Sequence, residues 1–539
     1  MRPRTHCGAD ESVLIGKPRI IVHLDYCCDA IGIASEPAVT DGFCGFTTFC
    51  DRHRTPIAWN PGHPNNPPMD PRPPLDSVRP LARRSLCLAG RGTATDYARA
   101  LLASLGATVS VSAGPDDTEP STAWARSGLM ALTGLVDGPP QMCPVSIASC
   151  ADGVMQALRC VAPATLASAL PAGAAMLGER AAIAGLQRNG AVSPGGGCHL
   201  LQACDGWFAI SLARATDWAA VPAWLENERI DTWETVAAAA ASRRVETLVE
   251  RARLLGLAAC VSALPAAGRP WYAMTQPGPP ASPQERRGPL RLLDLSSLWA
   301  GPLCSHLLQI LGARVVKVES LGRPDGARDG PPLFYDLLNA GKRSVGLNFD
   351  EAGIARLHEL IDWADVVIEG SRPRGLRQLG VIAEDCIARR SGLTWISITG
   401  YGRDEPECNW TAFGDDAGVA GGLSALMHEM TGLPLICGDA IADPLVGMHA
   451  ALAALASHQG GGGRLWSLPL RDVVANCVAF SMPVDHAALR ERWESWTAAA
   501  RAGNLDMTAP VARRTELRAR NLGADTDSVL TGLAIHADT

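Results

Sequence analysis

The sequence lacks an excess of positive charge. Its 539 residues carry a formal net charge of −7 at pH 7, whereas nucleic acid and anionic membranes attract basic proteins. It also lacks a continuous apolar run of the ~20 residues that span a bilayer, and an apolar stretch of signal-peptide length near its start. We therefore expect a soluble protein that is not exported and has neither nucleic acid nor a membrane as its partner.

A compact disulfide framework is also absent. The 17 cysteines are scattered through predicted strands and helices, unlike those of a small secreted domain. Histidines and cysteines occur within residues 6–53, but their spacing is not that of paired C-x-x-C metal ligands. These patterns predict a reduced, cytoplasmic protein without a bound metal.

Segments rich in proline divide the chain. Residues 61–80 are dense in proline and poor in apolar side chains, so we expect residues 1–80 to be a disordered or non-native extension, with Met69 as an alternative start. A second segment rich in proline and glycine, residues 276–289, predicts a linker. It would separate a first half (81–275) from a second half (290–480), which is followed by a helical tail (481–539).

The second half alternates short strands with helices. Leucine and β-branched runs predict strands, and apolar residues at helical spacing predict the helices between them. Gly312 follows one such helix as a left-handed stop, and the right-handed crossover rule makes the flanking strands parallel. This half therefore predicts a Rossmann-like, open parallel α/β sheet, with its ligand beyond the carboxyl ends of the strands. The predicted strands are 292–295, 315–318, 365–369 and 393–399, and the predicted helices are 307–311, 351–363 and 382–390.

Six ordered strings in this half resemble the class III CoA-transferases, the carnitine dehydratase-like family. They are LLDLSSLWAGP (292–302), LGARVVKVE (311–319), LNAGKRSVGLN (338–348), ADVVIEGSRPRGLRQLG (364–380), SITGYG (397–402) and GDAIADPLVGMHAALAALA (438–456). The resemblance covers about a third of the chain. It implies an enzyme that moves CoA between an acyl-CoA and a carboxylic acid.

The resemblance implies that Asp443 is the nucleophile. Its carboxylate would attack the acyl-CoA thioester and form an aspartyl-acyl anhydride, so that the thioester's energy is conserved for the acceptor acid. Asp443 before Pro444, at the start of an apolar run, predicts a helix N-cap followed by proline at N1, where the helix dipole favours the ionised carboxylate. Asp-Pro is also a common helix start without chemistry, so the ordered strings, and not this dipeptide, favour catalysis.

The phosphates of CoA need fixed cations and backbone donors. Lys342, Arg343 and Arg372 would supply the cations at the ends of strands, although each is also compatible with a solvated surface charge. Gln378 stands where the family often has arginine, which leaves that contact to Arg377. The other contacts implied by the resemblance are Trp299, Ala300, Gly370, Ser371 and Thr399.

The first half contains a degenerate partial repeat of the second. Gly106 corresponds to Gly312, and Ser149 stands in the place of Asp443, so only the second half can form the anhydride. The corresponding ranges are 100–111 with 306–317, 127–134 with 421–432, and 152–155 with 445–448. The first half lacks counterparts of the basic motifs.

Three further features of the sequence concern the site. The string DGWFAI (205–210) resembles a strand of the smaller α+β domain in family members. The Gly-rich segments 193–198 and 460–463 are candidates for a loop that shields the anhydride from water. Gly90 and Gly92 after an apolar run, with Asp117 further on, mimic a dinucleotide fingerprint, but Thr95 at the third glycine position disfavours an NAD site.

Two alternatives to CoA transfer stay open. Some relatives are 2-methylacyl-CoA racemases that use a histidine in a Gly-His-Asp string, where this chain has Phe413-Gly414-Asp415-Asp416; the missing histidine disfavours racemisation. The chain could also bind acyl-CoA without turning it over.

The oligomeric state is open as well. The chain could form an interlocked homodimer as relatives do, or its internal repeat could satisfy that arrangement within one chain.

Overall fold

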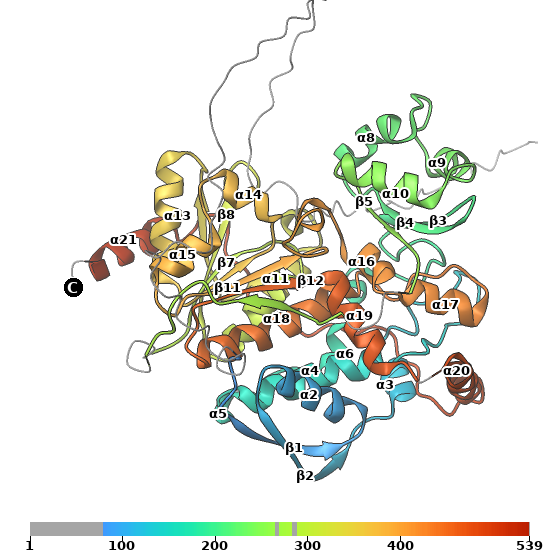
Figure 1. The fold of residues 1–539 in the computed structure, drawn as a ribbon, viewed down its shortest axis with the longest axis horizontal. Coiled ribbons are helices and arrows are strands. Elements are labelled where there is room, and N and C mark those ends of the chain that lie inside the picture. Colours follow the sequence, from blue (N-terminus) through green and yellow to red (C-terminus); the bar gives the residue numbers. More distant parts are fainter. Residues whose placement is uncertain (1–78, 265–268, 283–287, 484, 538–539) are drawn as a thin grey trace, which may run out of the picture.

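The computed structural model describes residues 79–264, 269–282, 288–483 and 485–537 (Figure 1). The expected N-terminal extension up to residue 78, with Met69 and the cysteines and histidines of residues 6–53, lies outside the described residues. Among the described helices, none is both long and apolar enough to cross a bilayer.

A seven-stranded sheet forms the centre of the second half, in the order β6-β12-β11-β10-β7-β8-β9. All neighbouring pairs are parallel except β12 with β6, so the expected open parallel sheet is confirmed. The strands are β6 Ala273–Thr275, β7 Arg291–Leu295, β8 Arg314–Ser320, β9 Arg343–Leu347, β10 Val366–Glu369, β11 Thr394–Thr399 and β12 Arg464–Pro469. β6 lies inside the range predicted for the first half, so that boundary is wrong by a few residues.

Helices cover both faces of this sheet, because alternate strand residues point to opposite sides. Leu292 and Val315 pack in the core with α11 and α18, whereas Leu293 and Val316 pack in a separate core with α13 and α15. Gly312 ends α11 with φ +90°, as its sequence position predicts. The elements of this half are α11 Ala300–Ile310, η1 Gly326–Asp329, α12 Pro332–Asn339, α13 Glu351–Trp363, α14 Pro373–Gln378, α15 Ala383–Arg389, η2 Glu407–Asn409, α16 Gly414–Ala420, α17 Leu423–Thr431, α18 Ala442–Gln459 and α19 Leu470–Ser481.

The start of the first half has the same local arrangement on a smaller scale. A parallel pair, β1 and β2, is joined by α2, and α4 packs on α2 as α18 packs on α11. A Cβ on Gly153 of α4 would lie 2.5 Å from the Ala94 carbonyl oxygen, and one on Gly447 of α18 would lie 2.7 Å from that of Ala300. The two glycines thus permit equivalent helix contacts. The elements are β1 Ser85–Arg91, α2 Thr93–Ser104, β2 Thr108–Asp116, α3 Pro120–Arg126, α4 Ile147–Val161, α5 Ala164–Ala167, α6 Gly173–Met176 and α7 Glu179–Ala184.

The glycines that mimic a dinucleotide fingerprint do lie between β1 and α2. The carboxylate of Asp117, however, accepts hydrogen bonds from the backbone amide of Thr95 at 2.7 Å and from its hydroxyl at 3.1 Å. A dinucleotide phosphate would need these helix N-terminal donors. Because a carboxylate already takes them, the structure also disfavours an NAD site here.

A small α+β domain completes the first half. Its antiparallel strands are β3 Cys198–Ala203, β4 Gly206–Ser211 and β5 Ala258–Val261, and its helices are α8 Ala215–Leu225, α9 Trp233–Ala240 and α10 Val245–Leu254. Figure 1 shows it in green, beside the large sheet and close to α16. β4 contains the string DGWFAI except for its first residue. This domain contacts the second half through β4 and β5, which touch α16.

The tail returns to the large sheet. It contains α20 His486–Arg501 and α21 Thr526–Ala537, in line with the prediction of helices. α21 contacts α13 and β9, and the Asp525 carboxylate before it accepts a hydrogen bond from the backbone amide of Ser344 in β9 at 2.9 Å. This side chain therefore fixes the tail to an edge strand.

Candidate functional site

Asp443 lies at a cavity of about 640 Å³ that both halves of the chain line. The first half contributes Arg180, residues 192–199, the end of β4 and two tryptophans of the small domain. The second half contributes residues 298–299, 413–415, Phe334, Ala440 and Asp443. The candidate nucleophile therefore faces a space that neither half forms alone.

Asp443 is the second residue of α18, and Ile441 is the N-cap. The expectation that Asp443 itself caps the helix is wrong by two positions, but the residue stays in the first turn, where the helix dipole favours negative charge. The first residue of α11, Ala300, lies beside the carboxylate and offers its backbone amide. Two helix N-termini thus meet at this side chain.

The first residue of α16 leaves room for the carboxylate. A Cβ on Gly414 would lie only 2.0 Å from Oδ2 of Asp443 and 2.6 Å from the carbonyl oxygen of Ala440. Any side chain at position 414 would therefore displace the carboxylate or the turn before it.

The environment of Asp443 differs from the expected one. The residue is fully buried, and neither carboxylate oxygen makes a hydrogen bond of ordinary geometry. Burial raises the pKa of Asp443 well above its usual range, and the Ala300 amide offsets this only in part. Desolvation thus opposes the effect of the helix dipole at this side chain, and the ionised form of Asp443 stays a prediction. The carboxylate must be ionised to attack a thioester.

Backbone strain is concentrated at this cavity. Among the described residues other than glycine, positive φ occurs at Glu226, Leu298 and Ala440, and the last two line the cavity. The Asp325 carboxylate accepts a hydrogen bond from the Leu298 amide at 2.9 Å, and the Asp415 carboxylate accepts one from the Ala440 amide at 2.6 Å. Such strain costs ~1–3 kcal/mol per residue and collects at functional sites.

A buried charge cluster supports the turn before Asp443. The Arg180 guanidinium makes a bidentate ion pair with Asp439, and its Nε lies 2.8 Å from Oδ2. Burial and the neighbouring Asp439 raise the pKa of Asp415, which lines the cavity, to about 6. Sequence reasoning missed Arg180 and Asp439, because no local pattern links an arginine of α7 to an aspartate 259 positions away.

One of the two candidate shielding loops lies at the site. Residues 193–198 line the cavity, and a Cβ on Gly195 would lie 3.5 Å from Nη2 of Arg180. Residues 460–463 lie elsewhere and pack closely on the backbone of Pro80, Gly278 and Gly392. The structure therefore favours residues 193–198, and not residues 460–463, as the candidate shielding loop.

Lys342 does not line the cavity. It is 2% exposed, and its ammonium donates to Asp294 (3.1 Å), Ser305 (2.7 Å), the Pro302 carbonyl (3.0 Å) and Asn339 (2.9 Å). Burial lowers the pKa of Lys342 to about 8. All of these partners belong to the protein, so the structure contradicts a direct phosphate contact and makes Lys342 a support for α11.

The other predicted CoA contacts are dispersed. Trp299 lines the cavity beside Ala300, whereas Arg343 is exposed at the amino end of β9, the end opposite to the expected site. Arg377 is exposed and pairs with Glu384 at 3.1 Å. The three small residues, Gly370, Ser371 and Thr399, lie at the carboxyl ends of β10 and β11. The Ser371 hydroxyl donates to Glu369 at 3.1 Å, and the Thr399 hydroxyl accepts a hydrogen bond from the Gly402 amide at 3.0 Å.

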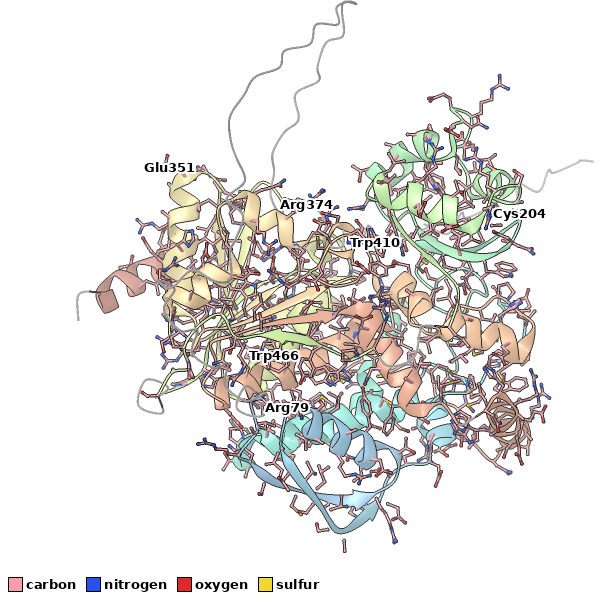
Figure 2. All side chains as sticks on the ribbon, viewed as in Figure 1. Arg79, Cys204, Glu351, Arg374, Trp410 and Trp466 are labelled. Carbon is pink, nitrogen blue, oxygen red and sulfur yellow. The ribbon has the colours of Figure 1, made fainter. Side chains whose placement is uncertain are left out.

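Arg372 lies at a second cleft of about 770 Å³, between the small domain and the large sheet. Arg214, Arg253 and Arg374 line the same cleft, and Arg253 stacks on Trp410 with its guanidinium carbon 3.7 Å from the ring centroid. Figure 2 shows Arg374 and Trp410 on the part of the second half nearest the small domain. Leu212 and Ala213 line the Asp443 cavity, and the next residue, Arg214, lines this basic cleft, so the two cavities meet the same segment of the small domain.

In the described part of the chain, no group of three or more histidine, cysteine, aspartate or glutamate side chains has an arrangement that could hold a metal ion.

Comparison with known proteins agrees with the motifs. Residues 289–511 match the model of CoA-transferase family III, so the resemblance seen in the sequence is confirmed for this segment. Formyl-CoA:oxalate CoA-transferases of Escherichia coli O139:H28 and Shigella boydii serotype 18 are each 30% identical over 199 residues, which is 35% of this chain and 48% of theirs. The chain thus matches about half the length of these curated relatives.

Solved structures give a partial likeness. Rv3272 from Mycobacterium tuberculosis is 29% identical at a TM-score of 0.33, with 36% of this chain and 56% of that chain covered. A CAIB/BAIF family protein from Brucella suis is 26% identical, also at a TM-score of 0.33, with 41% and 58% covered.

Proposed function

We propose that this protein is a CoA-transferase that moves CoA between an acyl-CoA and a carboxylic acid through an anhydride on Asp443. The observation that carries the proposal is the place of Asp443: a buried carboxylate at the N-termini of α11 and α18, facing a cavity that a Gly-rich loop borders. Burial of the carboxylate suits an anhydride, which water would destroy.

The reaction would proceed through balanced exchanges at one carboxylate. An oxygen of ionised Asp443 bonds to the thioester carbon, the carbon–sulfur bond breaks, and CoA leaves as a thiolate. The thiolate then attacks the Asp443 carbonyl carbon, which releases the first acid and leaves an aspartyl thioester. The acceptor carboxylate attacks this thioester, the carbon–sulfur bond breaks, and a second anhydride joins Asp443 to the acceptor. The released thiolate then attacks the acceptor's carbonyl carbon and displaces the carboxylate of Asp443, which is regenerated without hydrolysis.

Asp443 must be ionised to attack the thioester, and three neighbouring features bear on this step. Asp415 lines the same cavity, and because its pKa is raised to about 6, its carboxyl group can exchange a proton near neutral pH. The amide of Ala300 and the dipoles of α11 and α18 then favour the charged form. Residues 193–198 would limit the access of water.

The basic cleft is suited to the phosphates of CoA. Arg253, Arg372 and Arg374 line it from both domains, whereas Arg214 is paired with Asp217, and guanidinium groups bind phosphate oxygens as forks. Its position next to the Asp443 cavity would let the pantetheine arm bring the sulfur to the carboxylate. Because one chain lines both cavities, we expect a single chain to contain a complete site, without a residue from a second copy.

Hydroxylamine trapping tests the proposal. The full-length protein, incubated with acetyl-CoA and hydroxylamine, should lose activity and carry a hydroxamate at Asp443 that peptide mass spectrometry locates. Asp443→Asn should abolish both CoA exchange and trapping. Ser149→Ala is the matched control, because Ser149 lies four residues before Gly153 as Asp443 does before Gly447. Tight binding of acyl-CoA without trapping or exchange would instead identify a non-catalytic acyl-CoA-binding protein.

A racemase is a second candidate, and one observation favours it. Asp415 stands where the histidine of the racemases is expected, and it brings a titratable carboxyl group to the same cavity as Asp443. Two proton carriers could serve opposite faces of an acyl α-carbon. Incubation with 2-methylacyl-CoA in deuterated water, followed by mass spectrometry, decides the matter: deuterium at the α-carbon supports racemisation, and its absence excludes it.

A further inference from the structure

The small domain presents a cluster of three aromatic side chains, His199, Trp218 and Trp233, to the Asp443 cavity. The ring of His199 in β3 stacks on Trp233 of α9 with centroids 3.5 Å apart and planes inclined by 7°. Trp218 of α8 meets Trp233 edge-on at 5.1 Å and 78°. All three side chains are half-buried and line the cavity. Burial lowers the pKa of His199 to about 4, so its ring is neutral near pH 7 and adds to an apolar surface.

A second aromatic group lines the same cavity from the large-sheet side. Trp299 meets Phe334 edge-on, with ring centroids 5.4 Å apart and planes at 87°. Phe413 lies next to Gly414 and also lines the cavity. These three rings belong to the second half of the chain. The cavity therefore has aromatic side chains on both the small domain and the large-sheet side.

The size of the cavity also bears on the ligand. A volume of about 640 Å³ is typical of sites for drug-sized ligands, which are mostly apolar with a few placed polar groups. An acid of two carbon atoms would leave most of these aromatic surfaces facing water. A flat apolar body would cover them, and aromatic rings interact favourably in stacked and edge-on arrangements.

We propose that the acid handled at Asp443 has a planar apolar body, as in an arylalkanoic acid, which packs against His199, Trp218 and Trp233 while its carboxyl group meets Asp443. This inference rests on the proposed function and names its substrate class. The aromatic cluster formed by the three side chains lies outside the segment that matches the family model, so it would set this chain's own specificity.

The adenine of CoA is the main competitor for this aromatic cluster. In CoA the adenine lies at the far end of the pantetheine arm from the sulfur, so a base stacked in the Asp443 cavity would occupy the place of the reacting group. The basic cleft next to the cavity, with Arg253 stacked on Trp410, is better suited to the nucleotide. We therefore assign the aromatic cluster as the binding surface for the apolar body of the acid.

Calorimetric titration of the full-length protein with 3-phenylpropanoate, propanoate and oxalate tests the inference without relying on catalysis. We expect 3-phenylpropanoate to bind at least 10-fold more tightly than the two small acids. Trp233→Leu should weaken its binding on the order of 10-fold and leave propanoate unchanged. Trp218→Leu is a second variant in case Trp233→Leu does not fold, and Trp363→Leu, at the end of α13, is the control that should change neither.

Three outcomes would overturn the inference. They are equal affinity for the three acids, unchanged binding of 3-phenylpropanoate in Trp233→Leu and Trp218→Leu, and competitive displacement of 3-phenylpropanoate by adenosine 3′,5′-bisphosphate. Hydroxamate formation separates it from the proposed function. Trapping with acetyl-CoA but no preference for the aryl acid means that CoA transfer stands and the substrate class is wrong. Tight binding of the aryl acid without trapping from acetyl-CoA or 3-phenylpropanoyl-CoA means that the site stands and CoA transfer is wrong.

Discussion

Arg180 and Asp439 form a buried ion pair that joins the two halves of the chain beneath the Gly-rich loop. Their side chains are 6% and 0% exposed, and the guanidinium binds the carboxylate through two nitrogens. Asp439 lies four residues before Asp443, and Arg180 lies in α7 of the first half. The position of the nucleophile therefore depends on a contact between segments that are distant in sequence.

Removal of one partner of this pair should destabilise the protein. Asp439→Asn leaves the Arg180 charge buried without its partner, and we expect a loss of ~3–5 kcal/mol in the free energy of unfolding. Urea denaturation followed by circular dichroism measures it. The double variant Arg180→Met with Asp439→Leu should lose less than the sum of the two single changes, since the pair is removed together; strict additivity would contradict a direct coupling.

Gly414→Ala should impair catalysis while the fold is kept. A Cβ there would lie 2.0 Å from Oδ2 of Asp443, so the carboxylate must move, and a displacement of about 1 Å can cost on the order of 100-fold in rate. CoA-exchange kinetics measure the loss, with Gly532→Ala in α21 as a control, because a Cβ there meets no neighbour within 4 Å. Full activity of Gly414→Ala would contradict the placement of Asp443.

Lys342 should affect stability, and Arg343 should affect neither stability nor binding. Lys342→Met leaves Asp294 buried without its closest cation, so we expect a loss of ~3–5 kcal/mol in urea denaturation. The adjacent Arg343→Ala, at an exposed position, should stay within about 0.5 kcal/mol of the native protein. If Lys342→Met kept its stability but raised KM for acyl-CoA, the direct phosphate contact expected from the sequence would be right after all.

Arg372 should contribute to CoA affinity. Loss of a charge-assisted hydrogen bond to phosphate in Arg372→Ala should raise KM for acyl-CoA about 10-fold or more, with little change in kcat. Arg356→Ala is the matched control, because Arg356 is exposed on α13 and pairs with Glu359 at 2.9 Å. Steady-state kinetics at two salt concentrations provide the measurement, and the effect of Arg372→Ala should shrink at high salt. An unchanged KM for acyl-CoA in Arg372→Ala would exclude the basic cleft as the site that binds the phosphates of CoA.

The buried carboxyl of Asp415 should lower stability as pH rises. Its pKa is raised from an ordinary 3.8 to about 6 in the fold, so between these values the native state holds a proton that the unfolded state has lost. The contribution of Asp415 to the free energy of unfolding should therefore fall between about pH 4 and pH 6 and then level off. Urea denaturation across this range should show a smaller fall in Asp415→Asn, whereas Asp385→Asn, at an exposed position of α15, should match the native protein.

The elements of the second half were readable because their signals are local. Apolar periodicity placed α13 at Glu351–Trp363 and the strands within one or two residues of β7, β8, β10 and β11, and Gly312 marked a helix end through its own backbone requirement. The string around Asp443 likewise carried the candidate nucleophile. The helix start was misplaced by two residues, because an Asp-Pro pair is compatible with several positions in the first turn.

Tertiary structure decided what surrounds these elements. The sequence by itself determined the parallel sheet and the choice of Asp443, since side-chain period and motif order depend on neighbours in the chain. The sequence could not show that Lys342 is enclosed by four protein partners or that Arg180 pairs with Asp439. It also could not show that His199 and Trp233 line the same cavity as Asp443. Burial, pKa and cavity shape depend on which distant segments meet, and here those segments come from both halves of the chain, so only the folded arrangement contains that information.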